Sequence, residues 1–159
     1  MRAGMSEKSP SFLFRLLHLW FRLSRGLTLG VRAAIFDEAG RVFLIRHTYV
    51  KGWHLPGGGV EVGETALDAL GRELREEANI ELTGPALLRG IGFNTRSSRR
   101  DHVLVYEIRS FRQVGPKEPD REIAEAGFFP PDALPEGTTE PTRRRIAEIA
   151  AGRPAAERW

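Results

Sequence analysis

Three glutamates, Glu73, Glu76 and Glu77, stand close together at helical spacing. At positions i, i+3 and i+4 their carboxylates share one patch of helix surface, where like charges repel each other. A hard divalent cation can neutralise such a patch, and oxygen ligands in a chain without cysteine favour Mg²⁺ or Mn²⁺ over zinc. The spacing predicts a magnesium site, and a solvated acidic helix face is the plainer alternative.

The glutamates need a helix that begins at a fixed residue. Thr65 is a favourable N-cap, and Asp68 can complete a capping box with it. An apolar stripe of the same helix should face a sheet: Leu67, Leu70 and Leu74. Before the helix, the three glycines of residues 57–59 let the loop bend toward the carboxylates and aim backbone carbonyls at them. The combination of cap, glycine loop and spacing favours the metal site over the acidic face.

Residues 58–80 resemble the Nudix box of the Nudix hydrolase family. The matching positions are Gly58, Glu64, Arg72, Glu73, Leu74, Glu76, Glu77 and Ile80. The family has a glycine at the position of Asn79, just past the helix end. Asparagine tolerates the left-handed backbone that such a position commonly needs, so metal binding should be unaffected. The resemblance covers residues 27–152.

The resemblance implies a Mg²⁺-dependent enzyme, with Mn²⁺ as a substitute, that hydrolyses a diphosphate linkage. The substrate would be a nucleoside triphosphate or a nucleoside diphosphate joined to another group. The implied metal ligands are the Gly57 carbonyl and the carboxylates of Glu73, Glu76 and Glu77. Glu73 and Glu76 are also assigned to catalysis, together with Arg72, which would orient a glutamate.

The general base is left open by the sequence. By resemblance it is either Glu73 or an acid outside the box, for which Glu122 and Glu125 are candidates. Glu64 is expected to support the loop or to orient the metal ligands without binding the metal itself.

Candidate substrate-binding residues lie outside the box. Trp53 and His54 flank the glycine loop, and Arg96, Arg99 and Arg100 lie in a polar connection that could grip phosphates. For each of them, packing or simple surface exposure is the alternative.

Alternating apolar and polar residues predict a mixed sheet. Strands are expected over residues 27–37, 41–47, 86–94, 101–111 and 122–130, and a closing helix over residues 138–152. A turn at residues 37–40 indicates a hairpin between the first two strands. The fold class is therefore α/β, an α+β sandwich of the Nudix type with a mixed sheet flanked by helices. The expected divisions are an N-terminal helix segment (1–26), a Nudix domain (27–152) and a C-terminal tail (153–159).

Residues 9–26 predict an additional helix, basic on one face and rich in Phe, Leu and Trp on the other. Residues 1–26 carry a net charge of +4 and the rest of the chain −1. The charge therefore does not favour nucleic acid as a partner. The helix could pack on the domain, pack on a second copy in a homodimer, or lie in a membrane interface. The expected location is cytoplasmic, at the inner membrane surface if the helix binds lipid.

Two other functions are compatible with the box. One is an RNA 5′-end pyrophosphohydrolase, which would need a basic path for RNA and has residues 96–100 as its main support. The other is a non-catalytic module that binds a nucleotide. Because all the box glutamates are present, hydrolysis of a nucleotide-type small molecule is preferred.

Overall fold

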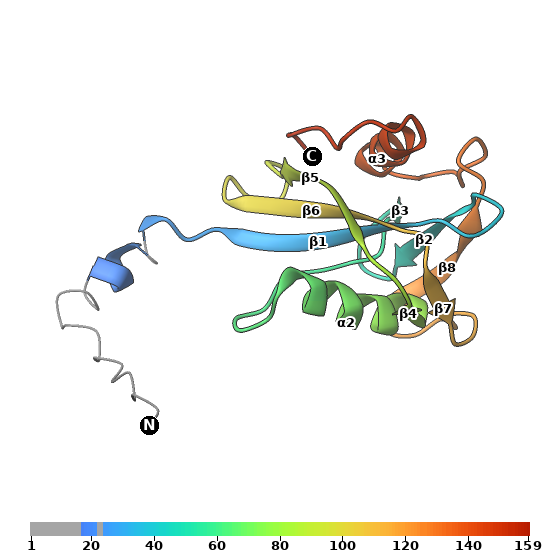
Figure 1. Cartoon of the computed structure of the whole chain (residues 1–159), viewed down its shortest axis with the longest axis horizontal. Helices are drawn as coiled ribbons and strands as arrows, with labels where there is room; N and C mark the ends of the chain where they lie inside the picture. Colours follow the sequence, from blue (N-terminus) through green and yellow to red (C-terminus); the bar gives the residue numbers. More distant parts are fainter. Residues whose placement is uncertain (1–16, 22–23) are drawn as a thin grey trace, which may run out of the picture.

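The computed structural model describes residues 17–21 and 24–159. In these residues the named elements follow one another along the chain as shown in Figure 1. They are β1 (Thr28–Ile35), β2 (Val42–His47), β3 (Trp53–His54), α2 (Ala66–Ala78), β4 (Ile80–Leu82), β5 (Leu87–Phe93), β6 (Asp101–Ile108), β7 (Phe111–Gln113), β8 (Ile123–Phe129) and α3 (Glu140–Ala150).

The strands form a central layer between two helices. One sheet has the order β1-β6-β5, a second β3-β2-β8, and a third pairs β4 with β7. Helix α2 covers one side of this layer and α3 the other (Figure 1). The predicted fold class, a mixed sheet flanked by helices, is confirmed.

Strand β1 shows how the period-two pattern builds two cores. Val31, Ala33 and Ile35 pack in the core beneath α2, whereas Ala34 and the following Phe36 pack in the core with α3. Side chains alternate across a strand, so a single strand serves both layers. Arg32 shares the parity of Ala34, and its polar side chain interrupts an otherwise apolar strand.

Of the expected hairpin between the first two strands, only the turn and one antiparallel bridge form. The Asp37 N–H donates to the Arg41 carbonyl at 3.0 Å, and Phe36 bridges Val42. Beyond the turn, β1 pairs in parallel with β6 and β2 pairs antiparallel with β8. The second edge of β1 is occupied by the glycine loop, which leaves no edge for β2.

Both predicted ends of α2 are observed. The Thr65 hydroxyl accepts a hydrogen bond from the Asp68 N–H at 3.1 Å, and the Asp68 carboxylate accepts one from the Thr65 N–H at 3.1 Å. The capping box is therefore complete. At the other end Asn79 has the left-handed backbone, with φ of 54° and ψ of 35°.

Most of the helix expected over residues 9–26 lies outside the described residues. Residues 17–21 are helical, and the side chains of Leu17, Leu19, Trp20 and Phe21 are exposed. Docking on a second copy or on a membrane surface stays a prediction. In the part of the chain that is described, no helix is long and apolar enough to cross a bilayer.

Candidate active site

The glycine loop is fixed along the free edge of β1. The Val31 N–H donates to the Gly58 carbonyl and the Ala33 N–H to the Pro56 carbonyl, both at 2.9 Å. Gly57 lies so close to β1 that a Cβ there would stand 2.1 Å from the Val31 carbonyl oxygen, and its φ is 137°. The loop therefore requires glycine at position 57, for close approach as well as for its backbone conformation.

Arg72 joins the helix to this loop. Its guanidinium donates to both carboxylate oxygens of Glu64 at 2.9 and 3.1 Å, to Glu73 at 2.7 Å and to the Gly59 carbonyl at 3.0 Å. Such a bidentate pair fixes the orientation of both partners. The geometry agrees with an orienting role for Arg72 and a supporting role for Glu64.

The Glu73 carboxylate lies directly on the glycine loop. A Cβ at Gly58 would come within 2.3 Å of the Glu73 Oε1. Any side chain at position 58 would displace this carboxylate. Gly58 therefore sets the place of Glu73, in addition to its backbone role.

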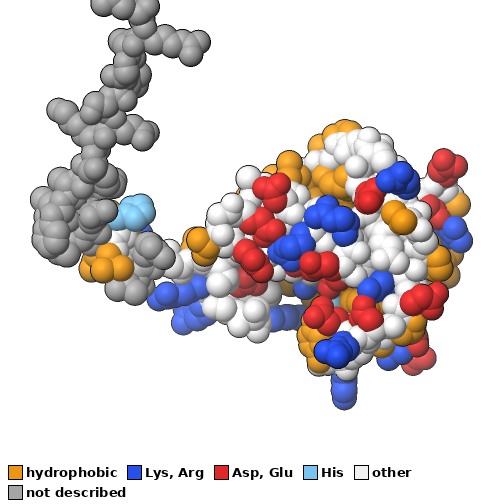
Figure 2. Space-filling model, turned by 90° about the horizontal axis from the view of Figure 1, so that it is seen from below, with side chains coloured by type: hydrophobic (Ala, Val, Ile, Leu, Met, Phe, Trp, Pro, Cys, Tyr) orange, Lys and Arg blue, Asp and Glu red, His pale blue; other side chains and the backbone are white. Residues whose placement is uncertain are grey.

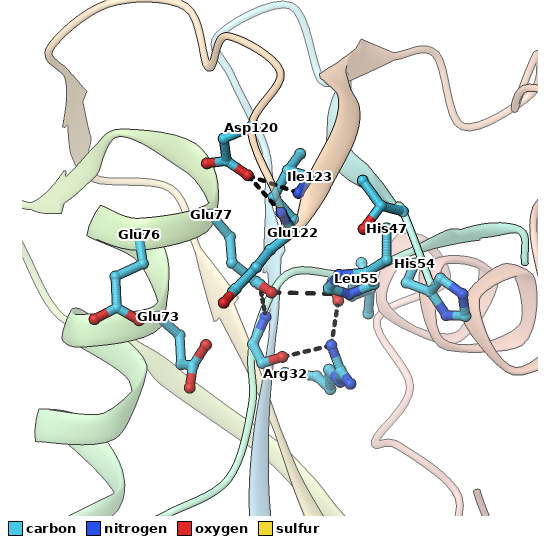
Figure 3. Close-up of polar contacts among 12 residues, drawn as sticks. Arg32, His47, His54, Leu55, Glu73, Glu76, Glu77, Asp120, Glu122 and Ile123 are labelled. Carbon is cyan, nitrogen blue, oxygen red and sulfur yellow. Dashed lines mark hydrogen bonds and ion pairs between the residues drawn. The ribbon is translucent and has the colours of Figure 1, made fainter. Parts of the chain in front are cut away.

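Glu77 is a buried carboxylate with no arginine or lysine in a direct ion pair with it in the described residues, although the charge of nearby Arg32 opposes the rise of its pKa. One of its oxygens accepts a hydrogen bond from the Gly57 N–H at 2.7 Å, and the other lies 3.8 Å from the His47 Nε2 (Figure 3). Burial raises the pKa of Glu77 to about 7, and burial lowers the pKa of His47. Neutral His47 cannot balance a Glu77 charge. A cation at this place would favour the ionised carboxylate.

Arg32 contacts the glycine loop at the candidate site, and sequence reasoning missed it. Its Nη1 donates to the Leu55 carbonyl at 3.0 Å and to the Gly57 carbonyl at 2.6 Å (Figure 3). Burial lowers the pKa of this guanidinium. The available signal was an arginine inside an apolar strand, where an unpaired charge would be costly. Arg32 holds the loop that carries Gly57.

The donor set fits a hard cation. Glu73 and Glu77 are mostly buried, while the Glu76 side chain is 59% exposed and reaches Arg72 only at 3.6 Å. A carbonyl has two lone pairs, so the Gly57 carbonyl can bind Arg32 and still serve as a ligand. In the described residues no three acidic, histidine or cysteine side chains are already gathered as for a metal. The oxygen donors match Mg²⁺ or Mn²⁺ in kind.

The two acids proposed as alternative bases lie in different surroundings. Glu122 lies beside Glu77 in Figure 3, and its charge contributes to raising the Glu77 pKa. Asp120 accepts hydrogen bonds from the N–H groups of Glu122 and Ile123, both at 2.8 Å, which hold this connection in place. Glu125 instead forms an ion pair with Arg46 on β2. Position therefore favours Glu122 over Glu125.

A cavity of about 360 Å³ opens beside the glycine loop. Its lining includes Arg32, His54, Gly58 and Trp159. A volume of this size lies at the lower end of the range for small-molecule sites. Gly58 lines the cavity and lies against the Glu73 carboxylate, so the cavity adjoins the acidic patch.

The expected substrate contacts divide between cavity, core and surface. His54 lines the cavity, whereas Trp53 is buried in the core against Phe129, with ring centroids 4.9 Å apart. The three arginines of the β5–β6 connection are exposed and line no part of this cavity: Arg96, Arg99 and Arg100. The structure gives Trp53 a packing role and leaves the arginines on the surface.

Comparison with known proteins agrees with this site. The NUDIX domain model matches residues 26–149. An RNA pyrophosphohydrolase from Halorhodospira halophila (strain DSM 244 / SL1) is 40% identical over 96 residues, which are 60% of this chain and 51% of that protein. The 8-oxo-dGDP phosphatase NUDT18 of Homo sapiens is 29% identical over 133 residues, 82% of this chain and 41% of that protein. The chain thus spans about half or less of the length of these two relatives.

Solved structures give the same result. The crystal structure of a MutT NUDIX hydrolase from Burkholderia pseudomallei superposes with a TM-score of 0.66 at 28% identity, covering 77% of this chain and 97% of that one. NUDIX hydrolases act on acid anhydrides and generally use divalent metal ions such as Mg²⁺. The matched domain includes the glycine loop, α2 and the acids that follow. The chain belongs to the NUDIX family.

Proposed function

We propose that this chain is a Mg²⁺-dependent hydrolase that cleaves a diphosphate linkage in a nucleoside triphosphate or a nucleoside diphosphate derivative. The observation that carries the proposal is the acidic end of α2 facing the glycine loop beside a cavity. There Arg72 holds Glu73, Glu77 is buried without a full counter-charge, and Glu76 is exposed.

Each residue has a task that follows from its contacts. Glu73, Glu76, Glu77 and the Gly57 carbonyl would hold the metal. A divalent cation bound there neutralises the diphosphate and lowers the pKa of water. Arg72 keeps the Glu73 carboxylate oriented, and Arg32 keeps the Gly57 carbonyl in place.

The water proton goes to a carboxylate of this chain. Glu122 is the preferred acceptor because it lies beside Glu77 and no ion pair holds it among the described residues (Figure 3). Glu73 is instead engaged by the Arg72 guanidinium at 2.7 Å and is assigned as a metal ligand. A bell-shaped pH–rate profile that loses its acidic limb in Glu122→Gln would identify Glu122 as the base.

RNA with a 5′-triphosphate is a second candidate substrate. The similarity to an RNA pyrophosphohydrolase favours it, as do the exposed Arg96, Arg99 and Arg100. Against it, the face that α2 presents in Figure 2 carries acidic and basic side chains interleaved, with no continuous basic path on that face. Small nucleotides therefore remain the first choice.

A substrate panel tests both candidates. It would contain nucleoside triphosphates, 8-oxo-dGDP, sugar nucleotides, dinucleotides and 5′-triphosphorylated RNA, each with Mg²⁺ and with Mn²⁺. We expect metal-dependent release of phosphate, pyrophosphate or a nucleoside monophosphate from a small nucleotide. Faster hydrolysis of the RNA, lost in Arg99→Glu, would favour the second candidate. Absence of any metal-dependent hydrolysis would leave the non-catalytic binding module.

A further inference from the structure

Residues 153–159, here the C-terminal segment, are held against β5. The Ala155 N–H donates to the Arg89 carbonyl at 2.9 Å, the Phe93 N–H to the Glu157 carbonyl at 2.7 Å, and the Trp159 N–H to the Phe93 carbonyl at 3.0 Å. Figure 1 shows this segment, in red, running over the end of the sheet beside β5. These bonds make the segment part of the domain instead of a loose tail.

Glycines in β5 permit this close approach. A Cβ at Gly90 would stand 2.9 Å from the Ala155 carbonyl oxygen, and one at Gly92 would stand 3.5 Å from the Trp159 ring. The segment can lie this close only because Gly90 has no side chain. At Gly92 an added Cβ would make only an ordinary van der Waals contact with the indole.

A buried ion pair on α3 anchors the segment from the other side. Arg145 is fully buried, and it donates to Glu148 and to the Ala156 carbonyl, both at 2.9 Å. The Glu148 carboxylate in turn accepts a hydrogen bond from the Ala156 N–H at 3.3 Å. The Arg145 guanidinium lies 5.8 Å from the centroid of the Trp159 ring. The Trp159 backbone is thus fixed on β5, with Arg145 of α3 near its ring.

The indole of Trp159 borders the 360 Å³ cavity beside the glycine loop. Arg32, His54 and Gly58 line the same cavity, and an added Cβ at Gly58 would stand 2.3 Å from the Glu73 Oε1. Apolar lining is added by Leu29, Leu55 and Val103, and the remaining lining is mostly polar. A lining that combines an indole with apolar and polar groups suits a flat heterocycle.

We propose that this cavity binds the nucleobase of the substrate, with the base stacked on Trp159 and the phosphates extending past Gly58 to the glutamates. The proposal rests on the proposed function and adds the residue that determines base binding. Stacking on an aromatic ring stabilises any base and is lost when the ring is removed. Trp159 is therefore a residue for base affinity, whichever base the substrate carries.

The test measures binding of the four ribonucleoside monophosphates and of inorganic phosphate by calorimetry. None of these ligands contains a diphosphate linkage, so binding is measured without turnover. We expect Trp159→Leu to raise the Kd of at least one monophosphate about tenfold, and Trp159→Phe to raise it less than threefold. The Kd of inorganic phosphate should stay the same in both variants, because phosphate has no base to stack.

Tryptophan fluorescence provides a second measurement and a matched control. A base stacked on Trp159 should quench its emission, and Trp159→Phe should remove that quenching. Trp20→Phe, a change at an exposed residue that does not line the cavity, should keep it. Melting curves of all variants separate loss of stacking from loss of folding.

These binding measurements distinguish failure of the nucleobase site from failure of the proposed hydrolase function. Monophosphate binding that depends on Trp159 in a chain without hydrolytic activity would support the cavity and overturn the enzyme. If no monophosphate binds more tightly than phosphate, or if Trp159→Leu weakens phosphate and monophosphate equally in a protein that melts normally, the nucleobase site is overturned.

Discussion

Both ends of α2 carry carboxylate side chains, but the pKa of the carboxyl group is shifted in opposite directions at the two ends. At the start, Asp68 accepts hydrogen bonds from Thr65, which lower its pKa. At the end, burial raises the pKa of Glu77 to about 7. The helix dipole acts in the same sense, because it favours negative charge at the N-terminus and disfavours it at the C-terminus.

This difference in pKa shift indicates that the start of α2 stabilises the fold and that its end forms the candidate site. The start is a satisfied cap that stabilises the fold. The end gathers acidic side chains without full compensation, an arrangement that costs stability unless a cation is bound. An uncompensated charge beside a cavity is typical of a functional site.

The largest expected effect is on turnover. Glu76→Gln keeps the shape of the side chain but removes one negative charge from the acidic end, so kcat should fall about a hundredfold. Arg75→Gln, which changes an exposed charge one residue away, is the matched control and should stay within threefold of the parent. Equal kcat for Glu76→Gln and the parent at saturating Mg²⁺ contradicts the metal assignment.

The second effect concerns stability and pH. Because the folded pKa of Glu77 is about 7, above its ordinary value of 4.5, the folded state binds more protons than the unfolded state between these values. Without metal, the free energy of unfolding should fall by about 2 kcal/mol more in the parent than in Glu77→Gln as pH rises from 5 to 8.

Urea denaturation in EDTA at both pH values measures this difference. Mg²⁺ at pH 8 should restore stability to the parent more than to Glu77→Gln, since only the parent has the carboxylate to bind it. Parallel stability curves for the two proteins would mean that Glu77 is adequately solvated or paired.

The satisfied start of the helix should respond differently. Thr65→Ala removes the hydroxyl that accepts the Asp68 N–H, at a cost of about 1 kcal/mol in stability. The acidic end is distant along the helix, so kcat at low temperature should be nearly unchanged. An unchanged melting temperature would show that the cap does not contribute.

The smallest effect is expected at Asn79. Replacement by glycine, the residue at this position in the resembling motif, relieves a left-handed backbone but loses the hydrogen bond from the Asn79 Nδ2 to the Pro116 carbonyl. The two changes oppose each other, so Asn79→Gly should alter stability by less than about 0.5 kcal/mol. Asn79→Ala loses the hydrogen bond without relieving the left-handed backbone, so it should lower the free energy of unfolding by about 1 kcal/mol or more.

Local features were predictable from the sequence, and long-range ones were not. The capping box of Thr65 and the backbone of Asn79 depend on neighbours within a few residues, and both were predicted correctly. The partner of β1 was not, because pairing with β6 joins residues far apart in the chain, and a turn signal carries no information about them.

The same distinction applies to the site. The glutamates share one helix, so their proximity follows from spacing alone. Arg32 reaches the glycine loop only after β1 and the loop pair side by side, and Trp159 reaches the cavity only after the C-terminal segment folds onto β5. Composition and period could not reveal either contact, although an arginine within an apolar strand was a usable signal.

The most direct test of the central assignment is Mn²⁺ or Mg²⁺ binding, measured by calorimetry, to the parent, Glu76→Gln and Thr65→Ala. The acidic end of α2 is assigned as the metal site and the capped start as structural support. We therefore expect Thr65→Ala to bind as tightly as the parent, and Glu76→Gln to bind at least tenfold more weakly while remaining folded. Equal affinity in the parent and Glu76→Gln would contradict the assignment.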